Sequence, residues 1–137
     1  MPAVETRVRV RYAETDQMGV VYHANYLVWM EIGRVEYWRA CGLRYRDMER
    51  EDGILLVVAE ANCRYQAPAF YDDEVLIRTT LAEASPRVVR FEYEMLAAAE
   101  PGQENRVLAT AYTKHVFCGR DRRPMKLPAK YHSALGL

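Results

Sequence analysis

Apolar and polar residues alternate along four stretches of this chain, a pattern typical of β-strands with one buried face. The stretches are residues 6–12, 74–81, 88–96 and 106–117, and a further range, 54–65, begins as a β-branched apolar run. The alternation places Val8, Val10 and Tyr12 on one face of the first stretch and His115 among the apolar residues of the last. We therefore expect five strands, with His115 in the core.

Residues 24–41 lack this alternation and indicate one long helix, because Gly42 follows where a left-handed C-terminal residue is common. Apolar side chains lie nearly all round the helical wheel, and the charged residues never gather on one face. A helix with this pattern is usually buried. Gly33 lowers the helix propensity, so we expect it to serve close packing against a sheet.

The order of elements is a strand, the long helix and then four strands. Strands that follow one another through short turns favour an antiparallel sheet. We therefore predict an α+β fold, a curved antiparallel sheet wrapped around one long central helix, in a single domain over residues 1–137. Residues 43–53 indicate a polar connection with a short helical turn, and the basic tail 119–137 is expected to be irregular.

The charge balance narrows the classes of partner. The 137 residues include 19 Lys and Arg against 19 Asp and Glu, so the net charge is zero. Without a basic excess we expect no nucleic-acid partner, and weak charge repulsion permits self-association. The first eleven residues show no signal-peptide pattern, and no stretch is long and apolar enough to span a membrane. We therefore expect a cytoplasmic protein with no membrane partner.

We predict neither a metal site nor a cofactor. Cys41, Cys63 and Cys118 are far apart and match neither a zinc spacing nor a disulfide framework. Reduced, buried thiols are the better interpretation. The three histidines are equally scattered and have no matching Cys or carboxylate spacing.

The chemistry-bearing stretch is residues 12–26, where Asp16 precedes the start of the long helix. A helix N-terminus presents free backbone N–H groups and a partial positive charge, which can hold an oxyanion as it forms. A carboxylate beside it can act as nucleophile or general base. Together these features indicate acyl-group chemistry. The structural alternative for Asp16 is to cap a turn or the helix end.

This stretch, Y-A-E-T-D-Q-M-G-V-V-Y-H-A-N-Y, resembles the motif of hotdog-fold acyl-CoA thioesterases related to 4-hydroxybenzoyl-CoA thioesterase. Residues 65–75, Y-Q-A-P-A-F-Y-D-D-E-V, and the order of elements resemble the same family. The resemblance implies that Asp16 is the catalytic aspartate, that the backbone N–H at His23 polarises the thioester carbonyl, and that Gly19 shapes the loop. It also implies an acyl-CoA substrate and a site between two subunits of a dimer or a dimer of dimers, a homotetramer.

From the residues and the resemblance we predict catalytic roles for Asp16 and His23 and substrate-binding roles for Gly19, Val20, Tyr22, Asn25 and Arg87. Arg87 is one of several cations, with Arg90 and the basic tail, that could meet the phosphates of coenzyme A. The structural alternatives are helix capping or a bond to a carbonyl for the histidine ring, and loop anchoring or an ordinary first-turn position for the asparagine. They are core packing for the tyrosine and a solvated surface for the cations.

The leading hypothesis is hydrolysis of an acyl-CoA to the free acid and coenzyme A. The alternatives are a non-catalytic acyl-CoA-binding protein of the same fold, a thioesterase acting on acyl-carrier protein, and a hotdog dehydratase. A dehydratase usually has a catalytic histidine with a carboxylate from the long helix, whereas Asp16 and His23 both precede that helix. A non-catalytic binder would be expected to lack Asp16. The sequence leaves open the acyl group and whether Asp16 acts as nucleophile or base.

Overall fold

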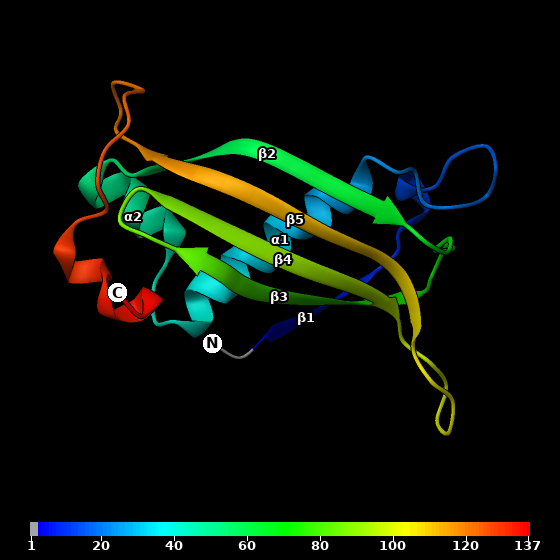
Figure 1. Cartoon of the computed structure of the whole chain (residues 1–137). Coiled ribbons are helices and arrows are strands. Elements are labelled where there is room, and N and C mark those ends of the chain that lie inside the picture. Colours follow the sequence, from blue (N-terminus) through cyan, green and yellow to red (C-terminus); the bar gives the residue numbers. More distant parts are fainter. Residues whose placement is uncertain (1–2) are drawn as a thin grey trace.

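The computed structural model describes residues 3–137 and consists of a five-stranded antiparallel sheet with one long helix across one face (Figure 1). The strands are β1 (Val4–Arg9), β2 (Leu55–Tyr65), β3 (Glu74–Ala84), β4 (Val88–Ala97) and β5 (Arg106–Cys118). The helices are α1 (Asn25–Ala40) and α2 (Tyr45–Asp52), with 3-10 turns at Tyr12–Glu14, Ala129–Tyr131 and Ser133–Leu135. The predicted α+β architecture is confirmed. The prediction of one domain also includes residues 1 and 2, which lie outside the described residues.

The strand order in the sheet is β1-β3-β4-β5-β2. The central strands β3, β4 and β5 are joined in sequence as hairpins, whereas β1 and β2 attach at opposite edges through long-range pairing. β1 pairs with β3, with Val8 opposite Val75, and β2 pairs with β5, with Leu55 opposite Cys118. The 11-residue strand β2 therefore forms one edge of the sheet, and most of its residues are exposed.

The core lies between α1 and the inner face of the sheet, and the alternation predicted that face correctly. The buried strand residues include Val75, Ile77, Thr79, Leu81, Val89, Phe91, Tyr93, Met95, Ala109, Ala111, Thr113, His115 and Phe117. Gly33 of α1 faces this surface: a Cβ added there would overlap the hydroxyl of Thr79 and lie 3.1 Å from Cγ2 of Ile77. The expected role of Gly33 in close packing is confirmed.

The prediction that the long helix is buried all round is wrong for a single chain. α1 buries Tyr26, Trp29, Met30, Gly33, Tyr37 and Trp38. On its other side Leu27 and Val28 are 46% and 47% exposed. The reason is geometric, because a sheet of five strands covers only one side of a helix.

The ends of the predicted elements also shifted. The first strand ends at Arg9 instead of residue 12, because the chain bends into the 3-10 turn at Tyr12–Glu14 and leaves Tyr12 77% exposed. α1 ends as predicted, with Gly42 in the left-handed region and the N–H of Leu43 donating to the carbonyl of Trp38 at 2.9 Å. The connection after it contains a full eight-residue helix, α2, and the tail contains two 3-10 turns.

Candidate active site

The loop that carries Asp16 closes on itself before α1 begins. Thr15 bridges to Val21, the N–H of Asp16 donates to the carbonyl of Val20 at 2.9 Å, and the N–H of Gly19 donates back to the carbonyl of Asp16 at 2.9 Å. Gly19 has φ +79°, a conformation that glycine adopts without steric cost. The sequence therefore folds this loop into a tight turn whose shape depends on Gly19.

The carboxylate of Asp16 has two different oxygens. Oδ1 accepts a hydrogen bond from the N–H of Met18 at 2.9 Å, so the turn-capping role considered for this residue is present. Within residues 3–137, Oδ2 accepts no hydrogen bond and remains free for chemistry. The hydrogen bond to Oδ1 fixes the orientation of the carboxylate and leaves Oδ2 able to accept a proton or attack a substrate.

Asp16 lines a pocket of about 340 Å³ at the start of α1. The other lining residues are Met18, Val20, Val21, His23, Tyr26, Tyr65, Gln66, Ala67 and Pro68. They come from three segments, which are the turn, the first residues of the helix and the end of β2 with the chain that follows it. The pocket thus combines a carboxylate with mostly apolar walls, as expected of a small-molecule site.

His23 supplies the helix end of the pocket. The N-cap of α1 is Ala24, which makes no side-chain cap, and in the described part of the chain the N–H groups of His23 and Ala24 donate to no protein acceptor. The carbonyl of His23 accepts from the hydroxyl of Tyr65 at 3.1 Å, so its peptide group is held in place. The unpaired N–H groups lie at the positive end of the helix and can receive an oxyanion.

The opposite wall is residues 65–70. The N–H of Val21 donates to the carbonyl of Ala69 at 2.9 Å and ties this wall to the Asp16 turn. Arg106 donates to the carbonyl of Pro68 at 2.9 Å from β5. The rings of Tyr26 and Tyr65 meet edge to face at 5.0 Å. Burial raises the pKa of Tyr65 to about 12, so its hydroxyl keeps its proton as a donor.

Three of the predicted site residues, Asp16, His23 and Val20, line this pocket together. Asn25 does not, because its side-chain amide donates to the carbonyl of Glu14 at 2.9 Å, which is the loop-anchoring alternative. Gly19 shapes the turn, and the ring of Tyr22 lies tilted against that of His23, with centroids 4.5 Å apart, without lining the pocket. Contact of the last two with substrate stays a prediction.

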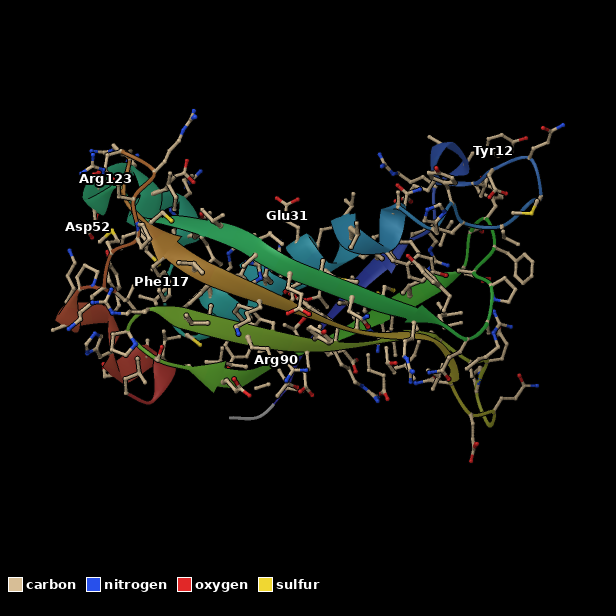
Figure 2. All side chains as sticks on the ribbon, turned by 45° about the horizontal axis from the view of Figure 1, so that its top comes forward. Tyr12, Glu31, Asp52, Arg90, Phe117 and Arg123 are labelled. Atoms are coloured by element: carbon tan, nitrogen blue, oxygen red, sulfur yellow. The ribbon has the colours of Figure 1, made fainter. Side chains whose placement is uncertain are left out.

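Arg87 lies far from the pocket of its own chain. It precedes Val88 at one end of β4, whereas the Asp16 turn lies at the other end, where Ala97 pairs with Val75. A ten-residue strand at ~3.3 Å per residue puts roughly 30 Å between them. In Figure 2, Tyr12 marks the end with the turn, and Arg123 of the basic tail lies at the opposite end. A role for Arg87 therefore requires a second copy of the chain.

Sequence reasoning missed the far wall of the pocket and one buried carboxylate. Tyr65, Gln66, Ala67 and Pro68 belong to the second stretch that carries the family resemblance, and this was the available signal for them. Glu14, at 6% exposure, is a buried carboxylate in the turn just before Asp16. Nothing in its local sequence distinguishes it from a solvated residue.

Two further titratable side chains, those of His115 and Glu60, lie outside this pocket. His115 is buried in the core, its Nε2 at 2.8 Å from the hydroxyl of Thr113, and Glu60 accepts from Tyr112 on the outer face of the sheet. A larger hollow of about 680 Å³ lies on that outer face among paired arginines and glutamates. No group of three or more metal-ligating side chains occurs in residues 3–137, and within this range no helix has the length and apolarity to cross a membrane.

Comparison with known proteins begins with a family model. The model of the thioesterase-like superfamily matches residues 10–135. Among individual relatives, YneP of Bacillus subtilis is 45% identical over 83 residues, which are 61% of this chain and 59% of YneP. The aligned part is thus less than two thirds of that relative.

Two solved structures show how far the similarity extends. The DHNA-CoA thioesterase of Staphylococcus aureus superposes with a TM-score of 0.90 at 32% identity, covering 99% of this chain and 90% of that protein. The 4-hydroxybenzoyl-CoA thioesterase of Pseudomonas sp. strain CBS-3 superposes with a TM-score of 0.86 at 24% identity, covering 98% and 99%. The second likeness speaks for the fold alone. Together they confirm the predicted hotdog fold.

Proposed function

The chain belongs to the thioesterase-like superfamily, and on this premise we propose that it hydrolyses the thioester bond of an acyl-CoA in the pocket of Asp16 and His23. One observation carries the assignment to this pocket. Asp16 and His23 line the same cavity. Within residues 3–137, one carboxylate oxygen of Asp16 accepts no hydrogen bond, and the N–H groups of His23 and Ala24 at the helix start have no acceptor. Thioester cleavage requires these two features, one near the carbonyl carbon and one at the developing oxyanion.

The chemistry can be followed from the protein groups. The carbonyl oxygen of the thioester accepts a hydrogen bond from the N–H of His23 or Ala24. These donors stabilise the negative charge that develops on this oxygen. Oδ2 of Asp16 either attacks the carbonyl carbon, which gives a mixed anhydride that water then hydrolyses to the free acid and Asp16, or removes a proton from a water that attacks the carbonyl carbon itself. Coenzyme A leaves as its thiolate, a good leaving group, so the site needs no strong general acid. The hydrogen bond from the N–H of Met18 to Oδ1 restricts the rotation of the carboxylate.

We propose that two copies of the chain complete the site by pairing along β2. This strand is a free sheet edge of 11 residues, and its Val57 and Val58 are 44% and 50% exposed. Exposed edges of this length and apolarity pair with other chains unless they are covered. The pocket lies at the end of the same strand, and Leu27 and Val28 of α1 are also uncovered. A second copy would cover these apolar groups, and a dimer of dimers remains the larger assembly to test.

The twofold pairing also supports a role for the basic residues. Antiparallel pairing of two identical β2 edges sets the start of one strand beside the end of the other. The start of β2 lies next to the tail, because Leu55 pairs with Cys118. The second copy would therefore bring its Arg87 and its basic loop, residues 119–126, toward the pocket of the first. Cations there can bind the phosphates of coenzyme A.

The decisive experiment measures thiol release from acyl-CoAs with short, long and aromatic acyl groups. Asp16→Asn should lower kcat by at least about 10²-fold with the fold retained, because a positioned base or nucleophile contributes that much. Glu104→Gln removes an exposed carboxylate between β4 and β5 and should leave kcat unchanged. Release that survives in Asp16→Asn would remove this residue from the mechanism. A wild type inactive on every acyl-CoA would favour an acyl-carrier-protein substrate or a binding role. Cytoplasmic location stays a prediction for cell fractionation.

A further inference from the structure

Glu14 is a buried carboxylate that the reaction itself does not use. It ends the 3-10 turn two residues before Asp16 and is 6% exposed. A carboxylate taken out of water is costly unless both of its oxygens find donors. Oε1 accepts from the N–H of Arg11 at 2.8 Å, and Oε2 accepts from the indole Nε1–H of Trp29 at 3.2 Å. The side chain thus joins the strand end before the turn to the second turn of α1.

The backbone of the same residue makes two more connections. Its carbonyl accepts from the N–H of Tyr22 at 2.8 Å and from the side-chain amide of Asn25 at 2.9 Å. Tyr22 lies just after the Asp16 turn, and Asn25 is the first residue of α1. Glu14 therefore contacts the chain before the turn, the chain after it and the helix at whose start the N–H groups of His23 and Ala24 lie, unpaired within residues 3–137.

Trp29 extends this connection to the pocket wall. Its ring is 1% exposed and packs on Tyr26 at 4.8 Å, and Tyr26 lines the pocket. The hydrogen bond from Nε1 to Oε2 of Glu14 joins two buried side chains, so neither partner has solvent as an alternative. The indole in turn is carried by the helix, so the pair Glu14 and Trp29 helps to hold the turn in place relative to the helix, together with the bonds of Tyr22 and Asn25.

We propose that Glu14 is a positioning residue for the hydrolysis, which holds Asp16 at a fixed place relative to the N–H groups at the start of α1. The inference rests on the proposed function of that pocket. The reason for an effect on rate is that the carboxylate and the oxyanion donors sit on different segments. A displacement of about 1 Å between such groups can lower a rate by about 10²-fold. The side chain of Glu14 adds to the backbone bonds of the turn a direct hydrogen bond from the segment before Asp16 to the body of α1.

The first test is Glu14→Gln, which keeps the volume but leaves one acceptor oxygen for two N–H donors. We expect kcat to fall about 10- to 100-fold, with KM for the acyl-CoA nearly unchanged, because the pocket walls remain. Trp29→Phe removes the donor of the same hydrogen bond and should lower kcat by a similar factor. The double variant should be no slower than the slower single variant, because both break the same bond. Glu104→Gln, at the exposed carboxylate between β4 and β5, is the matched control and should behave as wild type.

The second readout is the indole N–H resonance in a nitrogen–proton correlation spectrum. The protein has two tryptophans, and the Nε1 of Trp38 has no hydrogen-bond partner within residues 3–137. In Glu14→Gln the Trp29 resonance should move upfield while that of Trp38 stays, which shows that the bond is lost in a folded protein.

The outcomes separate this inference from the proposed function. A Trp29 shift with wild-type kcat would overturn it, since the bond would then serve the fold alone. A fall in kcat without the shift would also overturn it, as would additive losses in the double variant. The proposed function is tested separately, by thiol release from the wild type and its loss in Asp16→Asn. The three outcomes above therefore overturn the role of Glu14 and leave the proposed function standing. A wild type inactive on every acyl-CoA would overturn both.

Discussion

Gly33→Ala tests whether close packing of α1 on the sheet dominates over helix propensity. Gly33 lies in the middle of α1, and an added Cβ would overlap the hydroxyl oxygen of Thr79. Thr79 is fully buried on β3, and its hydroxyl has no hydrogen-bond partner within residues 3–137. Neither side can give way easily, because the helix and the strand are both held by their backbone hydrogen bonds.

Two effects of opposite sign decide the outcome. Replacing a mid-helix glycine by alanine should stabilise by about 1 kcal/mol through propensity alone. Forcing an extra methyl into a packed core costs about 1–3 kcal/mol, and more where backbone must move. The neighbouring Ile77 Cγ2, 3.1 Å from the added Cβ, tightens the site further. We therefore expect a net loss of about 1–2 kcal/mol of unfolding free energy, after propensity offsets part of the clash.

The assay is urea unfolding at fixed protein concentration, since association also affects stability. Adding Thr79→Ala to Gly33→Ala removes the clashing atom and should recover much of the loss. Thr79→Val is the matched control, because it keeps a methyl group where the hydroxyl was and should recover little. If Gly33→Ala alone stabilised the protein, the packing argument would be refuted. The same holds if Thr79→Ala and Thr79→Val restored the unfolding free energy equally.

The remaining predictions concern pH, assembly and phosphate binding. Burial, with the charge of Arg34, lowers the pKa of His115 from 6.5 to about 4. Between pH 6.5 and about 4 the unfolded state therefore binds more protons than the folded state, and acidification through this range should remove about 3 kcal/mol of unfolding free energy. Urea unfolding should show a smaller loss on acidification in His115→Gln. Equal losses in the two proteins would contradict the lowered pKa of His115. Val58→Lys on the exposed edge of β2 should give monomers, measured by light scattering, and a lower kcat/KM, measured by thiol release. Leu137→Lys on the exposed tail is the control and should change neither. A dimer that persists in Val58→Lys would exclude pairing along β2. Arg87→Ala should raise KM for acyl-CoA about three- to tenfold and leave KM for the phosphate-free acyl-pantetheine unchanged; equal increases would exclude a phosphate contact.

The sequence by itself determined the local features. Alternation marked most of the inner-face residues of β3, β4 and β5, because successive side chains of a strand point to opposite faces. At the strand ends near the pocket it failed, since Leu76, Leu96 and Leu108 are also buried. Gly42 marked the end of α1, because few residues other than glycine adopt its positive φ. The stretch around Asp16 and His23 indicated acyl-group chemistry, since the residues concerned are neighbours along the chain, and its resemblance to hotdog-fold thioesterases implied a thioester. Each of these signals spans a few consecutive residues, so no long-range information was needed.

The tertiary structure decided everything that depends on distant segments. It placed β2 at a sheet edge and left one side of α1 uncovered, although both are apolar in sequence. It put Arg87 at the far end of β4, and it brought Tyr65 into the pocket. It also buried Glu14 against Trp29, fifteen positions later in the chain. Strand order and burial arise from pairings between segments tens of residues apart, and local periodicity carries no record of which segments meet.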